Sequence, residues 1–332
     1  MKKHLLILGT GSVGKRHLGN LVKLGCEVSA MDPRRERLNE AAKVAPLVHQ
    51  FTSLEEALSL KQKFSGVIIA SPPKFHVEQS IAALRVDLPV FLEKPVSPDI
   101  SSAAKLVKVA HESRVPLLLG YTYRWWPPLL DLKKKIVEGM VGKIRHVRCV
   151  MSAHLADWHP WERYQDFFMA SRELGGGALL DESHFLDLIL WFFGAPSSLY
   201  ARVEKLSDLD IETDDNVDAL LDYPNGLRVS IHLDLFGRPH EKFITISGEG
   251  KTLHWSFEPN RIRFSESMGQ EWEDKTYSFE RNDMFVNAVK EFIEILDGRR
   301  SPSCTIDDGY AVMRTLEAMR ESSKMRKVVT VN

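Results

Sequence analysis

The sequence predicts an α/β protein. We expect an N-terminal Rossmann domain with a doubly wound parallel sheet, followed by an α+β domain with a largely antiparallel open sheet. Three observations indicate this. Short apolar runs alternate with helical segments over residues 1–121, a glycine-rich turn follows the first run, and strictly alternating apolar and polar residues mark the second half. Parallel strands covered on both faces are continuously apolar, whereas strands with one exposed face alternate.

The first domain, residues 1–121, is expected to consist of alternating strands and helices. Strands are predicted at Leu5–Leu8, Glu27–Met31, Val67–Ala70, Val90–Leu92 and Leu117–Leu119. Helices are predicted at Lys15–Leu24, Arg34–Lys43, Ser53–Leu60, Phe75–Leu84 and Ile100–Glu112. This order is typical of βαβ units with right-handed crossovers and a parallel sheet.

The second domain, residues 122–332, begins where this alternation stops. Its clearest signal is a hairpin, because Asn225-Gly226 separates alternating segments at 217–223 and 227–235. Further strands are predicted at Arg145–Met151, Phe243–Ser247, Leu253–Phe257 and Ile262–Phe264, and helices at Leu129–Glu138, Met284–Leu296 and Asp307–Ser323. We expect that the C-terminal helices can pack back on the first domain.

Composition narrows the class of protein without indicating a reaction. The 332 residues allow two domains of ordinary size, and 44 Lys+Arg against 45 Asp+Glu give a formal net charge of -1. A nucleic-acid-binding surface needs a basic excess, so no nucleic acid is expected as a partner. The three cysteines are far apart, and no segment is apolar enough for a signal peptide or a membrane span. We therefore expect a cytoplasmic protein with no membrane partner.

The glycine-rich turn between the first strand and the first helix matches the GxGxxG fingerprint. Its residues are Gly9, Thr10, Gly11, Ser12, Val13 and Gly14. In dinucleotide-binding folds the first glycine makes the tight turn, the second lets the backbone approach a pyrophosphate, and the third allows close helix–strand packing. Amide groups at the start of the helix then face the phosphates. A glycine-rich turn without a ligand is the alternative.

The end of the second predicted strand bears on the choice of cofactor. Asp32 follows Gly14 by 18 residues, a spacing at which an acidic side chain binds the ribose hydroxyls of NAD. Its charge would also repel the 2′-phosphate of NADP. Arg34 and Arg35 lie close by in the sequence and can bind that phosphate. NAD is the expected cofactor, with NADP as the alternative.

Two segments contain candidate catalytic residues. Glu93-Lys94-Pro95 follows a buried strand, and ligands of doubly wound folds bind beyond the carboxyl ends of strands, so Lys94 can donate to a substrate oxygen. A solvated lysine is the alternative.

The second segment begins with Gly175-Gly176-Gly177, which would let a ligand approach the backbone ahead of an amphipathic helix. On that helix Asp181, His184 and Asp187 are spaced by three, so each neighbours the next. An aspartate beside a histidine favours a general base. A packed, hydrogen-bonded histidine is the alternative.

Several motifs occur in one order along the chain. They are Gly9–Gly14, Ala70-Ser71-Pro72-Pro73 with His76, Glu93-Lys94-Pro95, Gly120-Tyr121-Thr122-Tyr123-Arg124 and the GGG…D…H…D segment. Together they resemble the glucose–fructose oxidoreductase / inositol dehydrogenase (Gfo/Idh/MocA) family. The resemblance implies that Lys94 binds the reacting sugar hydroxyl, His184 is the acid/base, and Asp181 supports it or contacts sugar. It adds Ser71, Pro72, His76, Glu93 and Lys94 to the cofactor site, and Tyr121 and Arg124 to the substrate site.

Two positions depart from the family pattern. The step from Asp181 to His184 is three residues where many members have a longer one, and Thr122 stands where many relatives carry Asn. The stretch 157–164 resembles a bacterial branch associated with surface polysaccharides or nucleotide sugars. Its Trp158, Trp161 and Tyr164 suit a sugar site because aromatic faces stack on sugars, with core packing as the alternative. No metal site is expected.

The function predicted from these residues is NAD(P)-dependent hydride transfer to or from a secondary alcohol of a sugar, cyclitol or nucleotide sugar. The alternatives are an NAD-dependent glycosidase of the same family and a non-catalytic, nucleotide-sensing regulator. A polar row formed by Arg228, Ser230, His232 and Asp234 indicates a solvated or subunit-facing sheet surface. We expect a homo-oligomer, a dimer or tetramer, assembled through this open face.

Overall fold

The structure is a computed structural model that describes residues 2–158, 162–265 and 271–331. It divides into two compact units. The first comprises residues 1–122 and 281–310, and the second residues 123–280 and 311–332. The chain therefore returns to the first unit after completing most of the second. Within the described residues, none of the helices is both long and apolar enough to cross a membrane.

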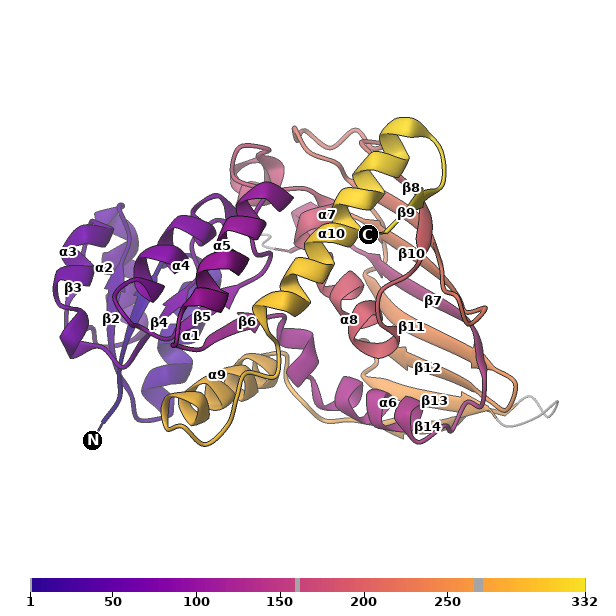
Figure 1. Cartoon of the computed structure of the whole chain (residues 1–332), viewed down its shortest axis with the longest axis horizontal. Helices are drawn as coiled ribbons and strands as arrows, with labels where there is room; N and C mark the ends of the chain where they lie inside the picture. Colours follow the sequence, from indigo (N-terminus) through magenta and orange to yellow (C-terminus); the bar gives the residue numbers. More distant parts are fainter. Residues whose placement is uncertain (1, 159–161, 266–270, 332) are drawn as a thin grey trace. The chain divides into compact units, whose positions relative to one another are not determined.

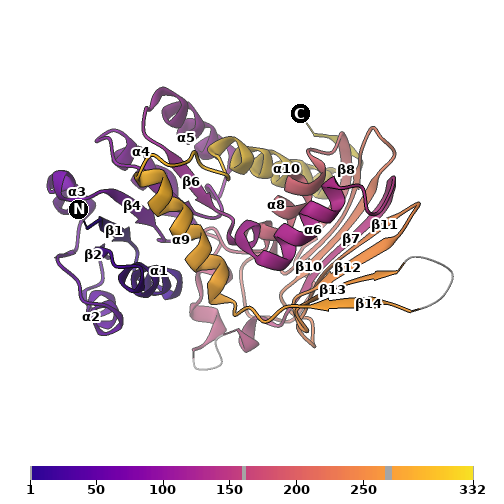
Figure 2. The same ribbon diagram turned by 90° about the horizontal axis from the view of Figure 1, so that it is seen from below.

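The first unit is built on a six-stranded parallel sheet with the order β3-β2-β1-β4-β5-β6. Its strands are β1 (His4–Leu8), β2 (Glu27–Met31), β3 (Gln50–Phe51), β4 (Gly66–Ile69), β5 (Val90–Glu93) and β6 (Leu117–Gly120). Its helices are α1 (Ser12–Lys23), α2 (Arg35–Val44), α3 (Leu54–Ser59), α4 (His76–Leu84), α5 (Ile100–Glu112) and α9 (Asn282–Leu296). Helices cover both faces of this sheet (Figures 1 and 2). The predicted Rossmann sheet is confirmed.

Helix α9 completes the core of this unit although it comes late in the chain. Asn282 at its start exchanges side-chain hydrogen bonds with Asn20 of α1 at 2.9 and 3.2 Å. Phe292 is fully buried, and its ring lies 3.2 Å from where a Cβ on Gly66 of β4 would stand. The missing side chain at Gly66 therefore lets α9 pack directly on the sheet.

The second unit is built on a nine-stranded sheet with the order β14-β13-β12-β11-β7-β10-β9-β8-β15. Its strands are β7 (Ile144–Ser152), β8 (Ser198–Glu204), β9 (Asn216–Asp222), β10 (Arg228–Asp234), β11 (Glu241–Gly248), β12 (Thr252–Ser256), β13 (Arg261–Ser265), β14 (Glu273–Thr276) and β15 (Val329–Thr330). Among the described strands of this nine-stranded sheet, only β7 and β10 pair in parallel. This confirms the predicted, largely antiparallel sheet.

Helices cover one face of this sheet and leave the other open (Figures 1 and 2). They are α6 (Pro127–Val137), α7 (Ala178–Asp181), α8 (Ser183–Phe193) and α10 (Ile306–Met325). Short 3₁₀ helices in the chain are η1 (Lys61–Lys63), η2 (Pro73–Phe75), η3 (Thr122–Trp125), η4 (Leu155–Asp157), η5 (Tyr164–Asp166) and η6 (Phe168–Ala170). In β10, Val229, Ile231 and Leu233 are buried, whereas Arg228 is exposed. The alternation of apolar and polar residues in the sequence of β10 thus corresponds to the helix-covered and the open face of the sheet.

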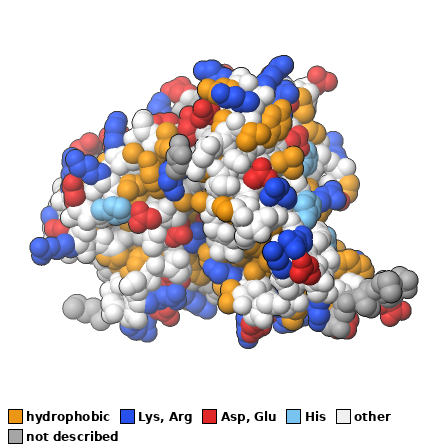
Figure 3. Space-filling model, turned by 45° about the vertical axis from the view of Figure 1, so that its right-hand side comes forward, with side chains coloured by type: hydrophobic (Ala, Val, Ile, Leu, Met, Phe, Trp, Pro, Cys, Tyr) orange, Lys and Arg blue, Asp and Glu red, His pale blue; other side chains and the backbone are white. Residues whose placement is uncertain are grey.

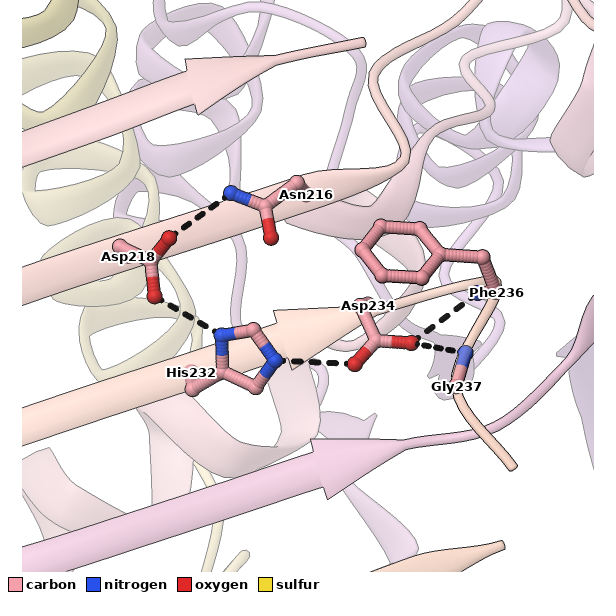
Figure 4. Close-up of polar contacts among 6 residues, drawn as sticks. All are labelled: Asn216, Asp218, His232, Asp234, Phe236 and Gly237. Carbon is pink, nitrogen blue, oxygen red and sulfur yellow. Dashed lines mark hydrogen bonds and ion pairs between the residues drawn. The ribbon is translucent and has the colours of Figure 1, made fainter. Parts of the chain in front are cut away.

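A charged cluster lies on the open face (Figure 4). His232 Nδ1 is 2.8 Å from Asp218 Oδ1, and its Nε2 is 2.9 Å from Asp234 Oδ2. Both ring nitrogens face carboxylates, so both donate when the ring is protonated. The hydrogen bond with Asp234 raises the pKa of His232 to about 9, with partial burial opposing it and Asp218 adding to it. The surrounding surface mixes positive, negative and histidine side chains (Figure 3).

The charge on His232 predicts a pH-dependent contribution to stability. Its folded pKa lies above its ordinary value of 6.5, so the stabilisation is complete below pH 6.5 and is lost as pH rises through about 9. We expect His232→Gln to lower the Tm by about 2 °C at pH 6 and by much less at pH 10. His146→Gln on β7, an exposed position, is the control and should leave Tm unchanged at both values. A deficit for His232→Gln that is equal at both pH values would contradict the assigned charge.

Candidate functional site

The predicted cofactor residues of the first unit lie at one edge of its parallel sheet. They follow the carboxyl ends of four strands: the glycine turn follows β1, Asp32 follows β2, Ser71-Pro72 follows β4, and Lys94 follows β5. Because all these strands run in the same direction, their carboxyl ends meet at the same edge, where doubly wound folds bind ligands. The topology therefore brings these sequence-predicted residues together.

The three fingerprint glycines have different neighbours. Gly9 has φ +87°, and a Cβ on it would stand 2.6 Å from the backbone of Ser71. A Cβ on Gly14 would stand 1.9 Å from the carbonyl oxygen of Gly9. A Cβ on Gly11 would meet only the Nη1 atom of Arg37, at 3.2 Å. Gly9 and Gly14 are thus required by the turn itself, whereas Gly11 keeps the backbone accessible at the start of α1, as a bound pyrophosphate would require.

Asp32 fixes the turn and retains capacity for a ligand. It is only 2% exposed, and its Oδ2 accepts hydrogen bonds from the amide and hydroxyl of Thr10 at 2.9 and 3.0 Å. Its Oδ1 accepts from the amide of Arg34 at 3.0 Å, and the Arg34 Nε lies 3.5 Å from the same oxygen. A carboxylate has about four lone-pair sites, so a ribose hydroxyl can still be accepted.

Arg37 was missed by sequence reasoning. It is half-buried on α2, and its guanidinium reaches the start of α1 beside Gly11. A signal was present, because Arg37 follows Arg34 by three residues and neighbours at that spacing share one face of a helix. The described residues at this edge therefore combine backbone amides, one buried carboxylate and two arginines, which fits a dinucleotide.

His76 links the loops that follow β4 and β5. Its Nδ1 lies 2.7 Å from the carbonyl oxygen of Pro95, and its Nε2 lies 2.8 Å from that of Ser71. The ring is 1% exposed. Burial lowers the pKa of His76, while the two carbonyls oppose that shift. Ser71 Oγ donates to Gln79, and Pro72 directly precedes η2.

Glu93 ends β5 and Lys94 follows it. Glu93 is buried, with Oε1 2.7 Å from Nε2 of the fully buried His17, whereas Lys94 is half-buried. Sequence reasoning missed His17. The signal for His17 is its place on the buried face of the amphipathic helix α1, whose buried residues are Gly14, His17, Leu18, Asn20 and Leu21. Tyr121, just after β6, is fully buried.

In the second unit, His184 and Asp181 lie on two successive helices, not on the single helix that the sequence predicted. Asp181 ends the four-residue α7 and is buried, whereas His184 lies in the first turn of α8 and is half-buried. Glu182 between them has φ -87° and ψ 13°, which interrupts the helix. The ring of Tyr123 packs against His184 edge-to-face, with centroids 5.1 Å apart.

Arg124 and Asp187 form a buried, bidentate ion pair. Arg124 Nε and Nη2 donate to the two carboxylate oxygens of Asp187 at 2.9 and 2.7 Å, and both side chains are almost inaccessible. The guanidinium also lies 5.7 Å from the ring centroid of Trp191. Breaking one partner of such a pair would leave an uncompensated buried charge. In this unit the pair attaches η3 to α8, and a role of Arg124 in substrate binding stays a prediction.

The glycines before α7 allow close packing within the unit. A Cβ on Gly176 would stand 2.3 Å from the carbonyl oxygen of Met169. Gly177 has φ +113°, and its Cβ would stand 2.5 Å from Asp214 Oδ1, while Asp214 Oδ2 accepts from the amide of Leu179 at 2.8 Å. Burial raises the pKa of Asp214. The interpretation that these glycines admit a ligand is replaced by packing at Gly176 and Gly177.

An ion pair between Arg238 and Asp157 lies just before Trp158, after β7. Arg238 Nε and Nη2 donate to Asp157 at 2.7 and 2.8 Å, just before Trp158. Trp158 Nε1 is buried and has no hydrogen-bond partner among the described residues. Tyr164 Oη accepts from the amide of Asp210 at 3.2 Å. The predicted sugar contact Trp161 lies outside the described residues.

Comparison with known families gives two matches. Residues 3–121 match the model described as the oxidoreductase family with an NAD-binding Rossmann fold, and residues 129–254 match the model described as the GFO/IDH/MocA C-terminal domain. The chain is 24% identical to an inositol 2-dehydrogenase of Leifsonia xyli over 93% of this chain and 90% of that protein. It is 28% identical to an uncharacterized oxidoreductase of Synechocystis, but the match spans 50% of this chain and only 44% of that protein.

Solved structures show the same fold over the whole chain. A levoglucosan dehydrogenase in complex with NADH and levoglucosan aligns with a TM-score of 0.90 at 18% identity, covering 100% of both chains. The WlbA dehydrogenase of Bordetella pertussis, in complex with NADH and UDP-GlcNAcA, aligns with a TM-score of 0.83 at 23% identity, covering 100% of this chain and 99% of that one.

The contrast between two glycines predicts separable effects. Gly11→Ala should fold with a Tm near that of the wild type, because only a flexible arginine tip lies near the added methyl group. It should weaken NADH binding by about tenfold or more, since the methyl group occupies the pyrophosphate approach. Gly14→Ala should instead lower the Tm markedly, because the methyl group meets backbone. Calorimetric titration and thermal unfolding measure both effects, and wild-type NADH affinity in Gly11→Ala would contradict the assigned site.

Proposed function

Because the chain belongs to the GFO/IDH/MocA family of NAD-binding oxidoreductases, we propose that it transfers a hydride between nicotinamide and a secondary alcohol of a sugar, cyclitol or nucleotide sugar. The observation that carries this proposal is the convergence of the glycine turn, Asp32 and Lys94 at one sheet edge. The names of relatives support the substrate class, since they include inositol 2-dehydrogenase and D-xylose 1-dehydrogenase.

We assign the chemistry to Lys94 and His184. When bound, the nicotinamide accepts or donates the hydride. Lys94 donates a hydrogen bond to the oxygen of the reacting hydroxyl and stabilises the developing alkoxide. His184 takes the proton from that hydroxyl and returns it in the reverse reaction. The edge-on Tyr123 ring holds the imidazole, and Asp181 either orients it or contacts the substrate.

NAD is the proposed cofactor, with NADP as the alternative. Asp32 places a buried negative charge where a 2′-phosphate would approach, which favours NAD. Arg34 and Arg37 lie close to the same site and would bind that phosphate if Asp32 were removed. For the substrate we propose contacts by Tyr121, Trp158 and Tyr164, with Arg124 and Trp161 as further candidates.

The role of Lys94 is tested by Lys94→Met with purified protein. NADH binding should stay within a few-fold of wild type, because the glycine turn and Asp32 are unchanged, while turnover of an identified sugar substrate should fall by about 100-fold or more. Binding is measured by calorimetry and turnover by NADH absorbance. Turnover within a few-fold of wild type would show that Lys94 does not stabilise the alkoxide.

Three measurements on the wild-type protein distinguish the dehydrogenase from the two alternative functions. Stoichiometric NADH release on oxidation supports the dehydrogenase. Cleavage of a glycoside without net NADH supports the glycosidase, and NAD-dependent binding to a protein partner without oxidation of any sugar in a broad panel supports the regulator. We also propose a cytoplasmic location, which is supported by three buried cysteines that form no disulfide.

We also propose that a second copy of the chain covers the open face of the nine-stranded sheet. A hollow of about 400 Å³ on this face is lined by Arg148, Tyr200, Arg202, Leu220, His232 and Glu241. Because this face carries side chains of both charges, opposite charges of two copies can pair across a two-fold axis in an isologous contact. Leu220 is 58% exposed there and would be buried by a partner.

The assembly is tested by Leu220→Arg. We expect it to convert the oligomer to a monomer in light scattering after size-exclusion chromatography, because a new charge would be buried at the contact. Leu206→Arg is the matched control, since Leu206 is also 58% exposed but lies outside the strands of the sheet. A wild-type monomer, or an oligomer unaffected by Leu220→Arg, would overturn this proposal.

A further inference from the structure

Lys94 lies between two residues that are each held by a buried histidine of the first unit. We propose that His17 and His76 are positioning residues that direct the ammonium group of Lys94 toward the reacting hydroxyl. The proposal deepens the proposed function, on which it rests for the role of Lys94. It gives a purpose to two buried histidines, one of which sequence reasoning had assigned to the cofactor and one of which it had missed.

His17 holds the residue before Lys94. Its Nε2 lies 2.7 Å from Glu93 Oε1, and the two side chains are 0% and 9% exposed. The rings of Phe91 and Phe285 pack edge-on against the imidazole, with centroids 5.2 and 5.9 Å away. His17 Nδ1 is buried without a partner among the described residues. Among the described residues, the His17 ring therefore makes one polar contact, with the carboxylate of Glu93.

A glycine on the neighbouring strand β6 leaves room for the side chain of Glu93. Gly120 on β6 pairs in register with Glu93, and a Cβ on Gly120 would stand 3.1 Å from Glu93 Cδ and 2.9 Å from the Phe91 ring. Apolar residues of similar volume often fill such a position at least as stably as a buried polar pair. The burial of the Glu93 carboxylate against the His17 donor therefore indicates that this residue has to be held in one position, and that filling the core is not its only role.

His76 holds the residue after Lys94. Its Nδ1 contacts the carbonyl oxygen of Pro95, and its Nε2 contacts that of Ser71 in the loop after β4. His76 thereby connects Pro95 to Ser71. Ser71 in turn lies against Gly9, where a Cβ would stand only 2.6 Å from its backbone. His17 lies on α1, the helix that the fingerprint turn opens. Both contacts thus tie Lys94 to elements that form the cofactor site.

This arrangement has a kinetic consequence. The side-chain contact at Glu93 and the backbone contact at Pro95 hold the residues on both sides of Lys94, which fixes the position of its Cα and the direction in which its side chain leaves the backbone. A catalytic group displaced by about 1 Å can reduce the rate by about 100-fold. Loss of either histidine contact should therefore reduce the rate of hydride transfer more than it reduces cofactor affinity.

The test uses pairs of variants that keep or lose one hydrogen bond. Gln places its amide nitrogen near the position of a histidine Nε2, whereas the shorter Asn does not reach it. We expect His17→Asn to lower kcat by about 10-fold to 100-fold for the sugar substrate identified in the Lys94→Met assay, with an NADH Kd within threefold of wild type. His17→Gln should recover most of kcat, because it restores the donor to Glu93.

The matched control is His4, a buried histidine of β1 in the same unit. Its Nε2 contacts Ser29 Oγ at 2.9 Å, so His4→Asn and His4→Gln make the same chemical change away from Lys94. These variants should change Tm, but they should not lower kcat while leaving the NADH Kd unchanged, as His17→Asn is expected to do. Equal effects of the Asn substitution at positions 4 and 17 would reduce the role of His17 to stability and overturn the proposal.

A second readout does not depend on catalysis. The rate at which an amine-reactive N-hydroxysuccinimide ester acylates Lys94, followed by peptide mass spectrometry, reports the position of its amine. It should change at least threefold in His17→Asn and stay near wild type in His17→Gln and both His4 variants. Failure of the proposed function appears as a wild type that oxidises no substrate, whereas unchanged acylation of Lys94 in folded His17→Asn overturns the present proposal alone.

Discussion

Buried hydrogen bonds between successive loops hold together the edge of the parallel sheet on which the first unit depends. Apolar strands bring four loops to that edge, but apolar contacts do not fix the order and direction of polar backbone. Asp32 binds the glycine turn through Thr10, and His76 binds the loop after β4 to the loop after β5. Each such group satisfies a partner that would otherwise be buried without one. The residues proposed to bind the cofactor thus support one another through contacts within the chain.

The second unit uses the same principle around His184. Asp214 accepts a hydrogen bond at the start of α7, and Arg124 with Asp187 attaches α8 to the preceding segment. Asp215, which is fully buried, accepts from the amides of Leu206 and Ser207. Charged groups buried to this extent are stable only when they are paired. Asp214 and Asp215 therefore hold loops of this unit in place through backbone amides.

The sequence predicted local structure well and long-range contacts poorly. The second strand was predicted at its observed bounds, and the hairpin at Asn225-Gly226 joins β9 and β10 as expected. β3, β8, β14 and β15 were missed. β3, β14 and β15 are short edge strands, which carry little periodic signal, whereas β8 is a seven-residue inner strand between β9 and β15. The reason for Gly177 lies 37 residues away at Asp214, and the partner of His17 lies 76 residues away at Glu93. Neither contact leaves a pattern in the neighbouring sequence.

The open-face cluster also reaches beyond its own strand. Asp234 binds His232 with one oxygen and the amides of Phe236 and Gly237 with the other, so the turn after β10 is attached to the histidine (Figure 4). The next residue, Arg238, donates two hydrogen bonds to Asp157, which ends η4 and directly precedes Trp158. The turn after β10 therefore contacts His232 of the open face through Asp234 and Asp157 of η4 through Arg238.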